Sequence, residues 1–82
     1  MKISVKVFGR YKDITGKEII QLTITEGDTL QDIINEFVKR YPIVLADKNR
    51  MMITKNKMFT SLNTTVTQDD EIILSPPVVS GG

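Results

Sequence analysis

One amphipathic helix constrains the fold of this 82-residue chain more than any other feature. Between Thr29 and Tyr41, apolar residues recur at spacings of three and four and form a single stripe. The stripe consists of Leu30, Ile33, Ile34, Phe37, Val38 and Tyr41. Thr29 is suited to cap the first turn, and Pro42 ends the helix. A helix with one apolar face must cover another element, so the rest of the chain is expected to supply a sheet.

Two segments before the helix alternate apolar and polar residues, as half-buried strands do. Lys2–Phe8 and Glu18–Thr25 both show this period of two. Between them, Arg10–Thr15 is bracketed by Gly9 and Gly16 and is long enough to hold one helical turn. We therefore expect two strands joined by a short connection.

The segments after the helix predict a hairpin and a final strand. Ile43–Asn49 reads as a connecting loop, and Arg50–Lys55 as a short strand. A turn at Asn56–Lys57 would lead into a return strand at Met58–Ser61. Glu71–Ser75 reads as a last, central strand. The predicted order is ββαβββ, which is an α+β fold with a mixed five-stranded sheet wrapped around one main helix.

The composition excludes several classes of function. The chain has no cysteine and no histidine, so it lacks thiolate nucleophiles, histidine bases and the usual zinc ligands. Its net charge of +1 argues against a nucleic-acid partner. No apolar run approaches the ~20 residues that span a bilayer. We expect no bound metal or cofactor, no membrane contact and a cytoplasmic location.

The C-terminal sequence Pro76-Pro77-Val78-Val79-Ser80-Gly81-Gly82 differs from everything before it. Two prolines cannot continue a hydrogen-bonded ladder, so we expect a domain at residues 1–75 and a flexible tail at residues 76–82. Gly81 and Gly82 lack Cβ atoms and can pass through a narrow channel. The simplest alternative is a frayed end without function. Two terminal glycines arise by chance in roughly 0.5% of chains.

A terminal carboxylate on Gly82 has a definite chemistry. Its ordinary pKa of ~3.3–3.7 keeps it ionised at neutral pH, which makes it a nucleophile toward the α-phosphorus of ATP. The chain has no phosphate-binding glycine loop of its own. Activation by ATP must therefore come from a partner enzyme. An activated acyl carbon can then accept either a sulfur nucleophile or an amine.

The sequence resembles the ubiquitin-like sulfur carriers, most closely the small subunits of molybdopterin synthases. The resemblance covers the whole chain and includes Phe8, Lys12, Asp13 and Gly16 in the first connection. It continues through the Thr29–Tyr41 helix and the Thr67–Glu71 turn, and it ends with Pro76-Pro77-Val78 and Gly81-Gly82. Relatives usually have one residue fewer between the prolines and the glycines, and an aromatic or apolar residue at the position of Ser75.

The resemblance implies a ubiquitin-like β-grasp fold and a non-catalytic carrier. Gly82 would be adenylated by a ubiquitin-activating-like enzyme and converted to a thiocarboxylate, with Gly81 as its threading residue. The large catalytic subunit would receive the tail in a heterotetramer and pass the sulfur to a cyclic pyranopterin precursor of the molybdenum or tungsten cofactor. The partner-binding residues would be Phe8, Phe59, Pro76, Pro77, Val78, Val79 and Ser80.

Three other functions remain open at this point. The chain can be a protein modifier that joins Gly82 to lysines, a carrier for thiamine or tRNA thiolation, or an interaction domain with an inert tail.

Two groups of charged residues also stand out. Lys48, Arg50, Lys55 and Lys57 form a loose basic cluster that reads as solvated surface. Residues 69–71 are acidic but lack the spacing of a calcium loop, so they read as a turn.

Overall fold

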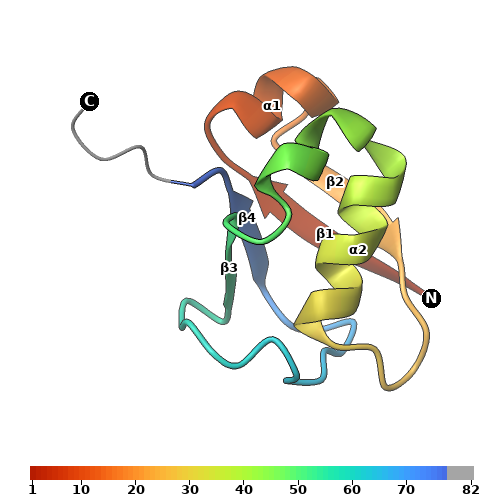
Figure 1. Cartoon of the computed structure of the whole chain (residues 1–82). Helices are drawn as coiled ribbons and strands as arrows, with labels where there is room; N and C mark the ends of the chain where they lie inside the picture. The colour runs from red at the N-terminus through yellow and green to blue at the C-terminus, as the bar shows by residue number, and fades with distance from the viewer. Residues whose placement is uncertain (78–82) are drawn as a thin grey trace.

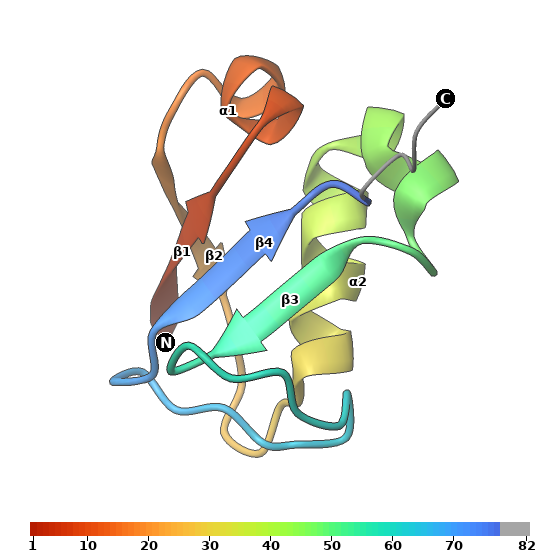
Figure 2. The same ribbon diagram turned by 90° about the vertical axis from the view of Figure 1, so that its left-hand side faces the viewer.

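The described residues 1–77 of the computed structural model form one mixed sheet of four strands in the order β2-β1-β4-β3. Residues 78–82 lie outside the described part. The strands are β1 (Lys2–Val7), β2 (Ile19–Thr23), β3 (Met52–Lys55) and β4 (Ile72–Ser75). The helices are α1 (Arg10–Thr15), α2 (Leu30–Arg40) and the 3₁₀ helix η1 (Pro42–Asp47). α2 lies across one face of the sheet (Figure 1, Figure 2).

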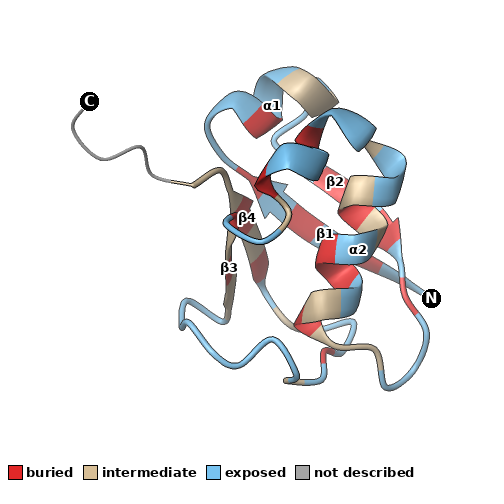
Figure 3. Ribbon diagram, in the orientation of Figure 1, coloured by how far each residue is buried: buried red, intermediate tan, exposed pale blue. Residues whose placement is uncertain are grey.

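The hydrophobic core lies between α2 and the sheet, and Figure 3 shows buried residues, in red, on both of these layers. β1 and β2 pair antiparallel, with Ile3 opposite Leu22 and Val5 opposite Ile20. All four side chains are buried. The period-two pattern therefore predicted correctly which face of each strand is buried.

α2 begins and ends where its sequence signals lie. The Thr29 side chain accepts a hydrogen bond from the Asp32 N–H at 3.3 Å, and the Thr29 N–H donates to the Asp32 carboxylate at 2.8 Å. These reciprocal bonds form a capping box, which satisfies donors that the first turn leaves free. Pro42 follows the last turn and starts η1. The predicted helix and its cap are confirmed.

β4 is an interior strand, as predicted. It pairs parallel with β1 and antiparallel with β3. Parallel pairing needs a long crossover between the two strands, and the whole middle of the chain, with α2, supplies it. The C-terminal ends of β1 and β4 consequently lie side by side at the same end of the sheet.

The predicted fifth strand at Met58–Ser61 is wrong for the described residues. Met58 forms only an isolated bridge to Lys55 after the turn, in which Asn56 and Lys57 both have positive φ. The chain then turns toward the start of α2. There the Leu62 carbonyl accepts a hydrogen bond at 3.0 Å from the Gln31 N–H in the first turn of the helix. The free N–H groups in the first turn of α2 thus bond to carbonyls of the segment that follows residues 58–61, at Leu62 and Thr64.

Two connections between the main elements are helical: the one between β1 and β2, and the one between α2 and β3. Arg10–Thr15 forms α1, which agrees with the helical turn that its length allows. The predicted loop at residues 43–49 is instead largely η1, whose Val44 is buried against the core. None of the helices within residues 1–77 has the length and apolar character to cross a bilayer.

Asp70 joins the turn after β3 to the turn before β4. Its carboxylate accepts hydrogen bonds from the Thr67 N–H at 2.8 Å and from the Asn56 amide at 3.0 Å. The Lys55 ammonium lies 3.8 Å away. Desolvation by burial acts to raise the pKa of Asp70, but the hydrogen bonds from Thr67 and Asn56 and the charge of Lys55 outweigh it and lower this pKa.

We expect Asp70→Asn to destabilise the domain by about 1–2 kcal/mol at pH 7, because the charged acceptor is lost. The pKa of Asp70 is lower in the folded than in the unfolded state. Its contribution is therefore present above the unfolded value of about 3.9 and is lost as the pH falls through the folded value. Urea unfolding of both proteins between pH 7 and pH 3 measures the difference. Asp69→Asn is the matched control at an exposed neighbour, and an equal loss there would contradict the prediction.

Candidate functional site

The predicted site begins where β4 leaves the sheet. Val7 pairs with Leu74 in parallel register, and the Phe8 N–H donates to the Leu74 carbonyl at 3.1 Å. Both strands run in the same direction, so the segment after β4 departs beside the start of α1. Pro76 and Pro77 follow and are half-buried. We call this place the tail exit, defined by Phe8, Gly9 and Pro76.

Gly9 allows the close approach of Pro76. Its φ of 59° and ψ of −140° lie in a region that residues with a Cβ atom rarely adopt. A Cβ atom built on Gly9 would lie 3.1 Å from Cγ and 3.4 Å from Cδ of Pro76. The backbone of Gly9 therefore lies close to the Pro76 ring, at the point where the chain leaves the sheet. Sequence reasoning used Gly9 only as the boundary of a connection, although a glycine directly after a strand is the signal for such an approach.

Gly9→Ala is expected to lower the free energy of unfolding by about 2–3 kcal/mol, because the backbone is strained and the new methyl group presses on Pro76. Gly16→Ala is the matched control. Gly16 also has a positive φ, of 73°, but a Cβ atom there would meet nothing within 4 Å. The control should lose only about 1 kcal/mol. Chemical denaturation checks both values, and equal losses would show that the contact with Pro76 has no effect.

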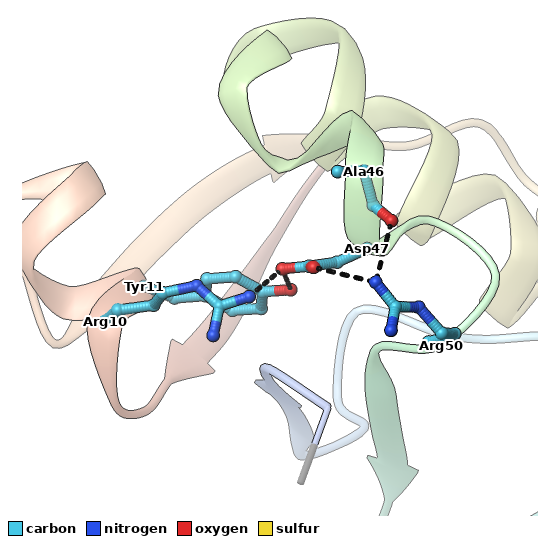
Figure 4. A network of polar contacts seen from close by, with 5 residues as sticks. All are labelled: Arg10, Tyr11, Ala46, Asp47 and Arg50. Atoms are coloured by element: carbon cyan, nitrogen blue, oxygen red, sulfur yellow. Dashed lines mark hydrogen bonds and ion pairs between the residues drawn. The ribbon is translucent and has the colours of Figure 1, made fainter. Parts of the chain in front are cut away.

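A polar network ties α1 to η1 beside the tail exit (Figure 4). The Asp47 carboxylate accepts hydrogen bonds from the Arg10 guanidinium and, at 2.9 Å, from the Tyr11 hydroxyl. Arg50 Nη2 lies 3.9 Å from the other carboxylate oxygen and donates to the Ala46 carbonyl at 3.3 Å. Asp47 is only 7% exposed. Its partners compensate for the cost of burying a charge.

Tyr11 acts in this network as a permanent donor. Burial raises the pKa of its phenol, and the hydrogen bond and negative charge of Asp47 raise it further. Tyr11 therefore stays protonated at neutral pH and donates its hydroxyl hydrogen to Asp47. Sequence reasoning missed the network because Asp47 lies in a segment without periodicity, and because Tyr11 and Asp47 are far apart in the chain.

Phe8 and Phe59, predicted to bind partners, are both accessible but lie beside opposite ends of β4. Phe8 is 40% exposed and lies at the tail exit, with the Lys6 ammonium 5.1 Å from its ring centre. Phe59 is 67% exposed and follows Met58, which bridges to Lys55 opposite the start of β4. The structure thus supplies two separate apolar positions, and their use in binding stays a prediction.

The loose basic cluster predicted around the hairpin is divided between the two ends of β3. Lys48 and Arg50 come shortly before β3, near the tail exit, where Arg50 faces Asp47. Lys55 and Lys57 lie at the far end of β3, where Lys55 faces Asp70. Of the acidic residues next to Asp70, Asp69 lies in the predicted turn and Glu71 directly precedes β4.

The predicted reacting residue Gly82 and its neighbour Gly81 lie outside the described part of the chain, as do three predicted partner-binding residues, Val78, Val79 and Ser80. The flexible tail predicted for residues 76–82 thus falls largely outside the described part. The boundary between domain and tail stays a prediction. The structure places the point from which these residues start, between Gly9 and the end of β4.

Comparison with known proteins identifies relatives along nearly the whole chain. The profile of the ThiS family matches residues 5–82. The molybdopterin synthase sulfur carrier subunit of Arabidopsis thaliana is 28% identical over 82 residues, which are 100% of this chain and 84% of that protein.

Solved structures match the fold. The putative molybdopterin converting factor subunit 1 of Pyrococcus furiosus superposes with a TM-score of 0.82 at 23% identity, covering 95% of this chain and 99% of that chain. Small archaeal modifier protein 1 of Haloferax volcanii gives 0.78 at 17% identity, covering 94% and 98%. At these identities the likeness shows the fold alone. It confirms the ubiquitin-like β-grasp fold, here with four strands in the described residues.

A third structure is a protein–protein complex of subunits 1 and 2 of the molybdopterin-converting factor from Helicobacter pylori. It matches with a TM-score of 0.56 at 26% identity, covering 99% of this chain and 100% of that chain. The family profile, the curated relative and the fold agree, and the chain belongs to the ThiS family of ubiquitin-like sulfur-carrier proteins.

Proposed function

We propose that this chain is the small subunit of a molybdopterin synthase and carries sulfur as a thiocarboxylate on Gly82. The main support is the curated relative from Arabidopsis thaliana, a molybdopterin synthase sulfur carrier subunit that aligns with the whole chain. The alignment covers 100% of this chain and so includes the two glycines. The proposal requires that Gly82 has a free carboxylate.

Conversion of the Gly82 carboxylate to a thiocarboxylate takes two steps, adenylation and displacement of AMP by sulfur. The Gly82 carboxylate attacks the α-phosphorus of ATP on an adenylating enzyme, and pyrophosphate leaves. A sulfur nucleophile at the oxidation level of sulfide then attacks the acyl carbon, and AMP leaves. The product is a thiocarboxylate, which is a better nucleophile than the carboxylate that it replaces.

The large subunit of the synthase is the proposed acceptor of the tail. The complex of subunits 1 and 2 from Helicobacter pylori supports this pairing, and a heterotetramer would bring two carriers to one assembly. A dithiolene contains two sulfur atoms and each thiocarboxylate holds one, so two deliveries complete one pyranopterin. The proposed contacts are Phe8 and Phe59 on the domain and Pro76, Pro77, Val78, Val79 and Ser80 along the tail.

The test uses the thiocarboxylated chain, the large subunit and the cyclic pyranopterin precursor. Loss of the sulfur from the carrier together with formation of the dithiolene is the expected result. Transfer of sulfur to thiamine precursors or tRNA, with no reaction of the pyranopterin, would move the chain to another pathway. Peptides in which Gly82 is joined to lysine side chains of other proteins would support a modifier instead.

A further inference from the structure

Charged residues are unevenly divided between the two ends of the domain. β4 and α2 both run from the end opposite the tail exit toward the tail exit (Figure 1, Figure 2). Acidic residues gather where these elements begin, at Glu26, Asp28, Asp32, Asp69, Asp70 and Glu71, and outnumber the lysines at that end, Lys2, Lys55 and Lys57. Basic residues gather where they end, at Arg10, Lys39, Arg40, Lys48 and Arg50. α1 and the turn after it contribute charges of both signs. The basic residues named above therefore give the end of the domain at the tail exit a net positive charge, although the net charge of the whole chain is only +1.

Two arginines come from segments that adjoin the tail exit. Arg10 follows Gly9, whose backbone lies close to Pro76. Arg50 comes two residues before Met52, which pairs with Ser75 at the end of β4. Figure 4 shows Arg10 and Arg50 on either side of the Asp47 carboxylate.

Asp47 orients the two arginines without using all their donors. The Arg10 side chain is 49% exposed and the Arg50 side chain 69%, whereas that of Asp47 is 9% exposed. A guanidinium has five N–H donors in a rigid fork. Each arginine therefore keeps donors that face solvent, and one buried carboxylate leaves the group with a net positive charge. Such a pre-oriented pair suits the bidentate recognition of carboxylates.

The length of the tail determines what can reach these donors. Residues 78–82 span at most ~18 Å when fully extended. A protein that encloses the Gly82 end must then bring the mouth of its channel against the domain at the tail exit. The α-phosphate of ATP would lie beside Gly82 at the end of the tail. Arg10 and Arg50 lie where the tail begins, so they would meet the rim of the channel and not the phosphate.

We propose that Arg10 and Arg50, held by Asp47, are a docking point for carboxylate side chains at the rim of the channel in the adenylating enzyme that activates Gly82. This inference rests on the proposed activation of Gly82 and adds the electrostatic recognition that precedes it. Opposite charges across an interface mainly speed association and select the partner.

The test compares two double variants that lose the same positive charge. Arg10→Gln with Arg50→Gln alters the tail exit, and Lys2→Gln with Lys57→Gln alters exposed residues away from it. ATP–pyrophosphate exchange by the adenylating enzyme is measured against carrier concentration at low and at moderate salt. The arginine variant should raise KM about tenfold to a hundredfold at low salt with kcat unchanged within about twofold. The lysine control should keep the KM of the wild type, and added salt should shrink the difference.

A single Arg50→Gln variant guards against loss of folding, because Arg50 is largely exposed and is not needed to pair Asp47 with Tyr11. It should keep the melting temperature and still raise KM several-fold. An unchanged KM in the arginine variants would overturn the inference, as would an equal rise in the lysine control. Arginine-dependent binding of a single-stranded RNA oligonucleotide with unchanged KM would also overturn it. If the wild type is not adenylated at all, the proposed function itself fails.

Discussion

Removal of Gly82 is expected to abolish sulfur transfer while the domain keeps its stability. The shortened chain still ends in a glycine carboxylate, on Gly81, but this carboxylate lies one residue, about 3.4 Å, short of the reacting position. A misplacement of even 1 Å can cost about a hundredfold in rate. We therefore expect at least that loss in adenylation and no detectable thiocarboxylate.

Thermal unfolding provides the structural check on this variant, because the buried core of the described residues, which extends to Leu74, is unaltered in it. The melting temperature should match that of the full chain. Lys2→Gln, far from the tail exit, is the activity control and should be adenylated at the rate of the wild type. Normal adenylation of the chain that lacks Gly82 would refute the assignment of the reacting carboxylate.

Replacement of Phe37 by alanine is expected to have the largest effect on stability. Phe37 is fully buried, and its ring lies 5.2 Å from that of Tyr11 and 5.4 Å from that of Tyr41. Truncating a buried phenylalanine costs about 3–5 kcal/mol. A domain of this size has a total stability on the order of 4–12 kcal/mol. Phe37→Ala should therefore lose a large part of the domain's stability, at least about a quarter of it, as urea denaturation would show.

Phe59→Ala removes the same atoms from the surface and is the matched control. Since Phe59 is 67% exposed, its loss should change the free energy of unfolding by no more than about 0.5 kcal/mol. The same variant also tests partner binding, which would weaken without a change in stability. Equal destabilisation by the two substitutions would mean that the packing of α2 on the sheet is not what holds the domain together.

Regular patterns allowed much of the fold to be predicted from the sequence. The alternation in β1 and β2 and the stripe of α2 identified buried residues correctly because each reflects one repeating geometry. The Thr29 cap and the break at Pro42 are local effects of single side chains, so they were also predictable. Membership of the sulfur carriers followed from the C-terminal motif together with the resemblance along the chain.

The errors and omissions arose where the structure depends on contacts between segments that are far apart in the sequence. The return strand at residues 58–61 was predicted from its position after a turn, yet Met58 forms only an isolated bridge to Lys55, and the segment that follows bonds to the start of α2 at Leu62 and Thr64. The Asp47 network joins residues more than 30 positions apart, which no local pattern reveals. The close approach of Gly9 to Pro76 depends on the parallel pairing of β1 with β4 and was missed for the same reason.

The mass of the C-terminal peptide tests the proposed carrier chemistry most directly. The protein is incubated with its adenylating enzyme, ATP and a sulfide-level donor, and then digested and analysed by mass spectrometry. Replacement of one oxygen by sulfur on Gly82 is the predicted result. An unmodified carboxylate in a reaction that does form the Gly82 adenylate, or a natural protein that continues beyond Gly82 without cleavage, would contradict it.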